Sequence, residues 1–252
     1  MKAPGDEHLS KVPEVTLLFW LIKIAATTFG ETAGDAVSMS LNLGYLVGTL
    51  IFAVIFVGAV AVQIAVKEFR PFLYWATIIA STTVGTTMAD FADRSLGIGY
   101  VGGTLLLSAL LLASLYLWHR SLGSISIETV SNPKSETFYW VTIMFSQTLG
   151  TALGDWAADT AGLGYAGGAI VFGALLAMVA AAYFWTSLSR TLLFWAAFVL
   201  TRPLGAVVGD LLDKPVSEGG LALSRYSASA VLLAFIVVCI VVFPQRAART
   251  SH

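Results

Sequence analysis

The chain has 252 residues, of which 57% are hydrophobic and only 12% are charged, and its formal net charge is −1. Soluble domains of this size carry about a quarter charged residues, so most of this surface is expected to face lipid. The near-neutral charge argues against a nucleic-acid partner. A single cysteine excludes an internal disulfide, and the three histidines lie outside the apolar runs. We therefore expect no enzyme built on Cys–His or zinc chemistry, and no cofactor.

The apolar stretches of the chain predict eight transmembrane helices. The first fifteen residues are polar and lack the apolar core of a secretory signal, so the first helix is expected to be retained. Each later stretch is about as long as a membrane span. In chain order the predicted helices cover residues 16–39, 45–66, 72–93, 100–118, 137–159, 165–186, 191–213 and 226–243. The predicted fold class is an all-α integral membrane protein, with residues 1–252 forming one membrane domain.

These helices come from one two-helix unit repeated four times. In each copy an aromatic residue precedes a tryptophan, a glycine follows ten residues later, an aspartate five further on, and another glycine nine beyond that. The four registers are Trp20/Gly30/Asp35/Gly44, Trp75/Gly85/Asp90/Gly99, Trp140/Gly150/Asp155/Gly164 and Trp195/Gly205/Asp210/Gly219. The repeats cover residues 16–70, 71–120, 137–190 and 191–244, and the polar segment 121–136 separates two halves. Copy four has Lys214-Pro215 and Gly219-Gly220 in place of the Leu-Gly-Tyr turn, so an irregular loop is expected there.

The basic residues predict the orientation in the membrane. Because each unit crosses twice, all four copies must point the same way, and they are expected to be related by an axis along the membrane normal. The side of the termini carries Lys2, Lys11, Lys67, Arg70, Arg120, Lys134, Arg190, Arg246 and Arg249, whereas the opposite loops carry Arg94, Lys214 and Arg225. This bias places both termini in the cytoplasm.

Two faces of the first helix of each unit differ in character. Small residues recur every fourth position around Gly30, Gly85, Gly150 and Gly205, which favours close helix packing and carries no chemistry. A second face is polar, and its carboxylates and hydroxyls are hard oxygen ligands suited to a divalent cation, a proton or a hydrated ion. The candidate ion-binding residues are Thr28, Glu31, Asp35, Thr83, Asp90, Asp93, Thr148, Asp155, Asp159, Asp210 and Asp213, and the candidate metal ligands among them are Asp35, Asp90, Asp155 and Asp210. The alternative is that the aspartates only end helices at the membrane surface.

Three ionisable residues lie deeper in the predicted spans, where charge is costly and commonly functional: Lys23, Glu31 and Arg202. We expect Arg202, with Lys23, to serve as an internal counter-ion, and Arg202 to pair with Glu31 or a neighbouring aspartate. The alternative is a salt bridge that only fixes the register of the bundle.

The repeated tryptophans lie about one turn inside one membrane interface. This position favours an aromatic belt at the headgroups, and a gate at the cytoplasmic end is the alternative. Tyr45, Tyr100 and Tyr165 predict the matching belt on the other side.

The Trp/Gly/Asp/Gly registers, and above all the segment Thr-Thr-Phe-Gly-Glu-Thr-Ala-Gly-Asp at 27–35, resemble an uncharacterised family of bacterial inner-membrane proteins with four tandem two-helix repeats. The resemblance covers nearly the whole chain and implies an eight-helix protein of the bacterial inner membrane, but it brings no substrate. Glu31 and Gly34-Asp35 are also similar to the Glu and Gly-Asp pairs of cation exporters, although the spacing differs. Thr86, Thr151 and Ala206 replace Glu31 in the other copies.

The leading functional hypothesis is a secondary transporter of a small cation, such as a divalent metal, coupled to protons through an acidic interior. No nucleotide-binding loop is present, so the expected energy source is an ion gradient or the membrane potential. One alternative is transport of a small anionic or zwitterionic solute bound at Lys23 and Arg202. The other is a membrane scaffold or accessory subunit. The expected partners are the lipid bilayer and a small ion or solute, and the sequence also allows a homo-oligomer.

Overall fold

The computed structural model describes residues 10–248, and over these residues the chain forms eight long α-helices and no strand. Every predicted helix is present. Lys2 and Arg249, which contribute to the predicted orientation, lie outside the described residues. The helices are α1 Leu17–Asp35, α2 Gly44–Ala65, α3 Pro71–Asp90, α4 Gly99–Leu122, α5 Pro133–Asp155, α6 Gly164–Trp185, α7 Arg190–Asp213 and α8 Arg225–Val242.

Five of these helices, α2, α4, α6, α7 and α8, are long and apolar enough to cross a membrane, as expected of a helical membrane protein. The other three, α1, α3 and α5, are the first helices of copies one to three. They are less apolar because they are the helices that carry the polar stripe, and most of their side chains are buried within the protein.

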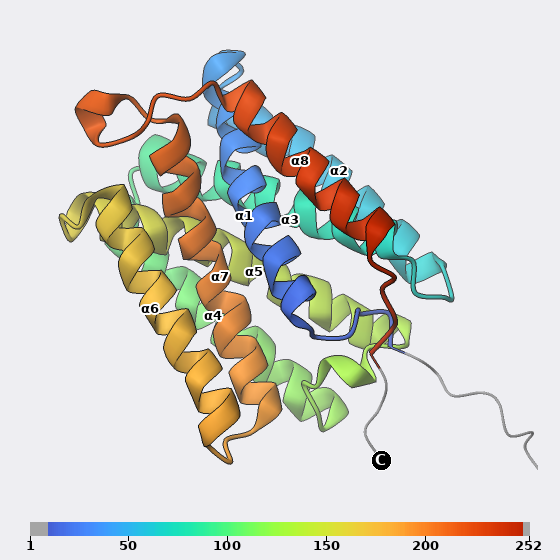
Figure 1. Cartoon of the computed structure of the whole chain (residues 1–252). Helices are drawn as coiled ribbons and strands as arrows, with labels where there is room; N and C mark the ends of the chain where they lie inside the picture. Colours follow the sequence, from blue (N-terminus) through green and yellow to red (C-terminus); the bar gives the residue numbers. More distant parts are fainter. Residues whose placement is uncertain (1–9, 249–252) are drawn as a thin grey trace, which may run out of the picture.

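The first helices of the four copies form a closed inner ring. α1 packs against α3, α3 against α5, α5 against α7, and α7 returns to α1 (Figure 1). The glycine ridge makes these contacts, as predicted, because each central glycine faces a side chain of the next ring helix. A Cβ at Gly205, for example, would lie 2.2 Å from Oγ1 of Thr27. The four facing pairs are Gly30 with Thr82, Gly85 with Gln147, Gly150 with Arg202, and Gly205 with Thr27.

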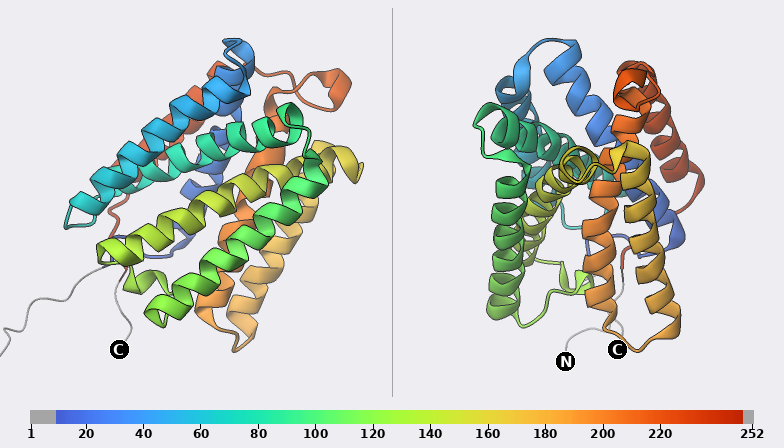
Figure 2. Two further views of the ribbon diagram at one scale, coloured as in Figure 1. Left: turned by 180° about the vertical axis from the view of Figure 1, so that it is seen from behind. Right: turned by 90° about the vertical axis from the view of Figure 1, so that its left-hand side faces the viewer.

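The second helices cover the ring from outside, and each packs against the first helix of the following copy. α2 lies against α3, α4 against α5 and α6 against α7, while α8 closes the circle against α1 (Figure 2). The two helices of one repeat unit therefore do not form a tight hairpin. The two helices that pack together come from neighbouring copies. The outer helices α2, α6 and α8 keep most of their apolar side chains exposed, which suits a surface in lipid.

In copies one to three, a π-helical turn follows the repeated aspartate directly, at Ala36–Ser40, Phe91–Ser95 and Trp156–Thr160. Two residues with positive φ then redirect the chain: Asn42 and Gly44 in copy one, with glycines at both places in the next two copies. Copy four lacks the π-helical turn and instead has an irregular loop with one short 3-10 helix, Val216–Glu218. The expected irregular loop is thus confirmed.

The segment between the two halves is shorter than the predicted 121–136. α4 continues to Leu122 and ends at Gly123, which adopts the left-handed conformation. α5 begins at Pro133, because the Asn132 side chain caps the helix in a capping box with Ser135 and proline suits the first helical turn. The Asn-Pro pair therefore starts a helix rather than marking a loop, and the predicted start at residue 137 is wrong by about one turn.

Both ends of the described chain meet the middle segment at one end of the bundle, which we call the terminal end. Pro13 pairs with Ala247 in a short antiparallel bridge, and the backbone N–H of Lys11 donates to the carbonyl of Val130 at 2.8 Å. The ammonium of Lys11 lies 2.7 Å from the carboxylate of the buried Glu136. The repeated aspartates lie at the opposite end of the ring, which we call the acid end.

Candidate functional site: the polar axis of the inner ring

The terminal end of the ring is closed by aromatic side chains. The aromatic residue before each tryptophan contacts the tryptophan of the next copy: Phe19 and Trp75 have ring centroids 5.4 Å apart, and Tyr74 and Trp140 lie 5.8 Å apart. The same contact recurs between Tyr139 and Trp195 at 6.3 Å and between Phe194 and Trp20 at 5.8 Å. We call these eight residues the aromatic layer.

The predicted tryptophan belt is wrong for three of the four tryptophans, whereas Trp20 is partly exposed. Trp75, Trp140 and Trp195 are at most 4% exposed, and Tyr74 and Tyr139 are fully buried with their hydroxyls 2.6 Å apart. A belt residue would instead face the headgroups. The second predicted belt is wrong for Tyr165, which is buried, whereas Tyr45 and Tyr100 are partly exposed.

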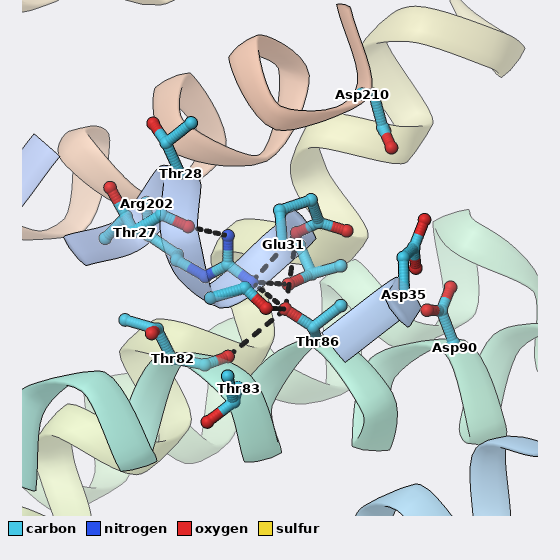
Figure 3. Close-up of polar contacts among 12 residues, drawn as sticks. Thr27, Thr28, Glu31, Asp35, Thr82, Thr83, Thr86, Asp90, Arg202 and Asp210 are labelled. Atoms are coloured by element: carbon cyan, nitrogen blue, oxygen red, sulfur yellow. Dashed lines mark hydrogen bonds and ion pairs between the residues drawn. The ribbon is translucent and has the colours of Figure 1, made fainter. Parts of the chain in front are cut away.

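At the middle of the ring, Arg202 joins all four inner helices (Figure 3). Its Nη2 atom lies 3.0 Å from a carboxylate oxygen of Glu31 on α1. It also donates to the hydroxyls of Thr86 on α3 and Thr151 on α5, at 2.5 and 2.6 Å. The predicted Arg202–Glu31 ion pair is therefore confirmed, and every group in this network is at most 3% exposed. Thr86 and Thr151 occupy the register of Glu31 in their own copies, so the guanidinium fills the space that this register surrounds.

The hydroxyls of Thr28, Thr83 and Thr148 do not join this network. Each donates to the backbone carbonyl one turn earlier in its own helix, at 2.9 to 3.0 Å, and Figure 3 shows Thr28 and Thr83 directed away from Arg202. The hydroxyls that do meet Arg202 are those of Thr86 and Thr151. The glycine ridge explains the difference. On each ring helix, the ridge of the neighbouring helix packs against the residues 7 and 11 positions after the tryptophan, such as Thr82 and Thr86 on α3. The threonine at position 8 therefore faces away from the axis.

At the acid end, three basic side chains bind the repeated aspartates. Arg94 lies 3.1 Å from Asp90 and 3.6 Å from Asp155. Lys214 lies 2.5 Å from Asp35 and 3.1 Å from Asp210. These contacts join the four predicted aspartates in two pairs, in each of which one base links the aspartates of neighbouring copies.

Arg225, at the start of α8, adds a fifth carboxylate to this assembly. It lies 3.1 Å from Asp213 and 3.9 Å from Asp35. We call Asp35, Asp90, Asp155, Asp210 and Asp213 the acid cluster; they are between 1% and 7% exposed.

The bases of the acid cluster were not predicted as site residues, although the sequence contains a signal for them. Arg94 and Lys214 both stand nineteen positions after the tryptophan of their copy, in copies two and four, whereas Met39 and Asp159 hold that position in copies one and three. A base four residues after an aspartate can reach that carboxylate along a helix. Comparing charge between copies at each register would have identified the alternation.

The two bridged aspartate pairs differ in their surroundings. Arg94 also donates to the hydroxyl of Tyr45 at 3.2 Å and is 31% exposed. On the other side, carboxylate oxygens of Asp35, Asp210 and Asp213 all lie within 4.8 Å of one another, which is close enough for one metal ion. Among the described residues, Oδ1 of Asp35 and Oδ1 of Asp213 are buried without a hydrogen-bond partner.

Burial alone would lower the pKa of Lys214, but the carboxylates of Asp210 and Asp35 outweigh it, so its pKa lies above the ordinary lysine value. The ammonium of Lys214 is therefore charged at neutral pH.

The remaining candidates lie apart from these contacts. Asp159 is exposed. Asp93 is buried beside Gly103 of α4, and within residues 10–248 neither of its oxygens has a hydrogen-bond partner. Lys23 is fully buried with its ammonium 4.1 Å from the centre of the Phe198 ring, and it too has no hydrogen-bond partner in this part of the chain.

The repeat register and the cyclic packing agree with the comparison to known families. The family described as Repeat of Unknown Function (DUF347) matches four times in tandem, at residues 18–69, 73–124, 138–189 and 193–246. The chain belongs to this family. Each DUF347 match begins within three residues of the tryptophan that opens a copy and includes its aspartate. No curated protein and no solved structure matches the chain.

Proposed function

We propose that this DUF347 protein is a secondary transporter that moves a small cation, coupled to protons, through the axis of the inner ring. One observation carries the proposal: the repeated carboxylates are buried together around a shared interior rather than spread over the perimeter. Acids that merely ended helices at the membrane surface would face water or headgroups. Taking several carboxylates out of water is costly, so their retention inside a bundle is typical of an ion pathway.

All eight long helices span the membrane in this proposal. α1 has 19 residues and α3 has 20, which corresponds to about 28 to 30 Å of helix and matches a hydrocarbon core of about 30 Å. Both lie in one ring with α7, which is apolar enough to span. With both termini in the cytoplasm of a bacterial inner membrane, the acid end faces outward and the aromatic layer faces inward.

The two central features act as barriers on this pathway. The guanidinium of Arg202 fills the interior between the acid cluster and the aromatic layer, so an ion must displace it from Glu31 to pass. The aromatic layer closes the terminal end below it. Transport then requires the ring to open at one end while it stays closed at the other.

Flux measurements in liposomes test this proposal. Wild type, Asp90→Asn and Arg202→Gln are reconstituted, and the uptake of Mn²⁺ and the accompanying proton movement are followed with internal dyes. Lys67→Gln, at an exposed lysine, is the control that keeps wild-type flux. We expect Asp90→Asn to lose most of the cation flux, because it removes a carboxylate from the acid cluster. Wild-type liposomes that carry no cation at any imposed gradient would contradict the proposal.

A second transport hypothesis remains attached to Lys23. Its buried ammonium has no hydrogen-bond partner and lies over the Phe198 ring, on the same helix face as Arg202 one turn further on. In this hypothesis an anionic solute binds between Lys23 and Arg202. Anion flux that Arg202→Gln abolishes and Asp90→Asn leaves intact would favour this hypothesis over cation transport.

A further inference from the structure

The ammonium of Lys214 lies between two carboxylates of the acid cluster. It lies 2.5 Å from Oδ2 of Asp35 and 3.1 Å from Oδ1 of Asp210. These two residues and Asp213 present oxygens that all lie within 4.8 Å of one another. A hard divalent cation such as Mn²⁺ or Mg²⁺ binds carboxylate oxygens in this way. In this structure the positive charges beside the three acids are those of Lys214 and Arg225.

Two of the three acids have a buried oxygen without a hydrogen-bond partner among the described residues. Oδ1 of Asp35 and Oδ1 of Asp213 accept no hydrogen bond among the described residues, although Asp35 is 1% exposed and the Asp213 side chain is fully buried. Lys214 contacts Oδ2 of Asp35 and Oδ1 of Asp210, and Arg225 contacts Oδ2 of Asp213, so neither base contacts these two Oδ1 atoms. A buried anionic oxygen without a partner is costly, so these atoms indicate a ligand with more coordination positions than an ammonium has.

The charge balance of the acid cluster agrees with a divalent ion. Its five carboxylates meet three cations, Arg94, Lys214 and Arg225, so with every group ionised two negative charges remain. If Lys214 leaves, three remain. The Glu31–Arg202 pair is neutral by itself and does not change this balance. One divalent cation thus replaces the lysine with a gain of one positive charge.

The position of Lys214 in the chain allows it to leave. It is the residue after α7, at the beginning of the irregular loop of copy four, and its flexible side chain carries a point charge. Arg94, the corresponding base of copy two, is planar, bridges two aspartates and is also bound to Tyr45. The side of the acid cluster with Lys214 is therefore the exchangeable one.

We propose that Asp35, Asp210 and Asp213 form a divalent-cation site and that Lys214 is a tethered cation that the incoming metal ion displaces. This inference rests on the acid cluster being a cation site, as proposed above, and adds the substrate class and the residue that competes for it.

The first experiment measures Mn²⁺ binding to the full chain in detergent, from the loss of the electron paramagnetic resonance signal of free Mn²⁺. Lys214→Met removes the competing ammonium and keeps the length of the side chain, so the affinity for Mn²⁺ is expected to rise by at least about tenfold. Lys67→Met is the matched control, since Lys67 is exposed and distant in sequence. Adding Asp210→Asn to Lys214→Met is expected to abolish the gain.

Several outcomes would overturn the inference. A folded Lys214→Met protein that binds Mn²⁺ no more tightly than wild type contradicts it, and so does a gain that persists with Asp210→Asn. If Lys214→Met does not fold, Lys214→Gln replaces it with the same expectation.

A second measurement needs no variant. In the wild-type protein, saturating Mn²⁺ is expected to increase the acetylation of Lys214 by an amine-reactive reagent, read by mass spectrometry, because the displaced ammonium becomes accessible. Lys67 is the internal reference. Unchanged acetylation of Lys214 would contradict the inference.

These binding results are independent of flux. Loss of flux in Asp90→Asn without tighter binding in Lys214→Met leaves the transport proposal and rejects the tethered cation. Tighter Mn²⁺ binding in Lys214→Met without any flux in wild type supports the metal site and the tethered cation and rejects the transport proposal.

Discussion

The two ends of the inner ring belong to the same four helices but carry different kinds of side chain. At the terminal end, eight aromatic side chains pack copy against copy, and the only polar contact among them is the hydroxyl pair of Tyr74 and Tyr139. At the acid end, five buried carboxylates are held by three bases, and some of their oxygens have no partner. In the aromatic layer every pair of neighbouring copies is joined by a ring contact, whereas at the acid end some carboxylate oxygens have no hydrogen-bond partner among the described residues. The difference indicates that one end fixes the bundle and the other is available to a ligand.

Removing one side chain from the aromatic layer is expected to have the largest effect on stability. Trp75 is 1% exposed, so Trp75→Ala leaves a cavity that the ring helices cannot fill, and the expected loss is about 3–5 kcal/mol. Thermal unfolding in detergent measures it. Trp185→Ala is the matched control, because Trp185 is 83% exposed and its removal leaves no internal cavity. If the folded Trp75→Ala protein binds Mn²⁺ less tightly than wild type, the separation of roles between the two ends is wrong.

The ridge between the two ends should be intermediate in its effect. A Cβ at Gly205 would lie 2.2 Å from Oγ1 of Thr27 and 2.8 Å from its backbone, so Gly205→Ala must push α7 away from α1. The expected cost is about 1–3 kcal/mol, measured by the same unfolding assay. Gly58→Ala in α2 is the control, because no atom lies within 4 Å of its Cβ position, and it should be neutral or slightly stabilising. Equal stability of Gly205→Ala and Gly58→Ala would contradict the role of the glycine ridge in packing the ring helices.

The smallest expected effect concerns the one polar contact of the aromatic layer. Tyr74→Phe removes a hydroxyl that lies 2.6 Å from that of Tyr139, both fully buried, and leaves the latter without this partner. The expected loss of stability is about 0.5–1.5 kcal/mol. Tyr116→Phe, at a side chain that is 66% exposed, should have the same stability as wild type. A Tyr74→Phe protein that is more stable than wild type would show that the hydroxyl pair is a burden rather than a contact.

Much of this architecture follows from the repeat register. Four copies of the tryptophan, glycine and aspartate pattern place eight helices within a few residues of their observed bounds and identify the faces that pack. The Arg202–Glu31 pair was also predictable, because charged groups inside spans need partners and these two lie at similar depth.

The orientation of single side chains was harder to predict. Thr28, Thr83 and Thr148 share a stripe with the aspartates on an isolated helix, but the glycine ridge decides which part of that stripe faces the axis. The pairing of each outer helix with the following copy was likewise hidden, because it depends on contacts between segments distant in sequence. Tryptophan near a membrane surface is equally compatible with a belt and with a core, and only the packing of neighbouring copies distinguishes them.

The packing of each outer helix against the next copy also has a consequence for biosynthesis. α1 leaves the ribosome first, yet the helix that covers it, α8, is made last. Until synthesis ends, α1 therefore lacks the outer helix that packs against it in the finished fold. In a circular permutant whose termini are joined and whose chain opens between α4 and α5, the helix made first would be α5 and the helix that covers it, α4, would be made last.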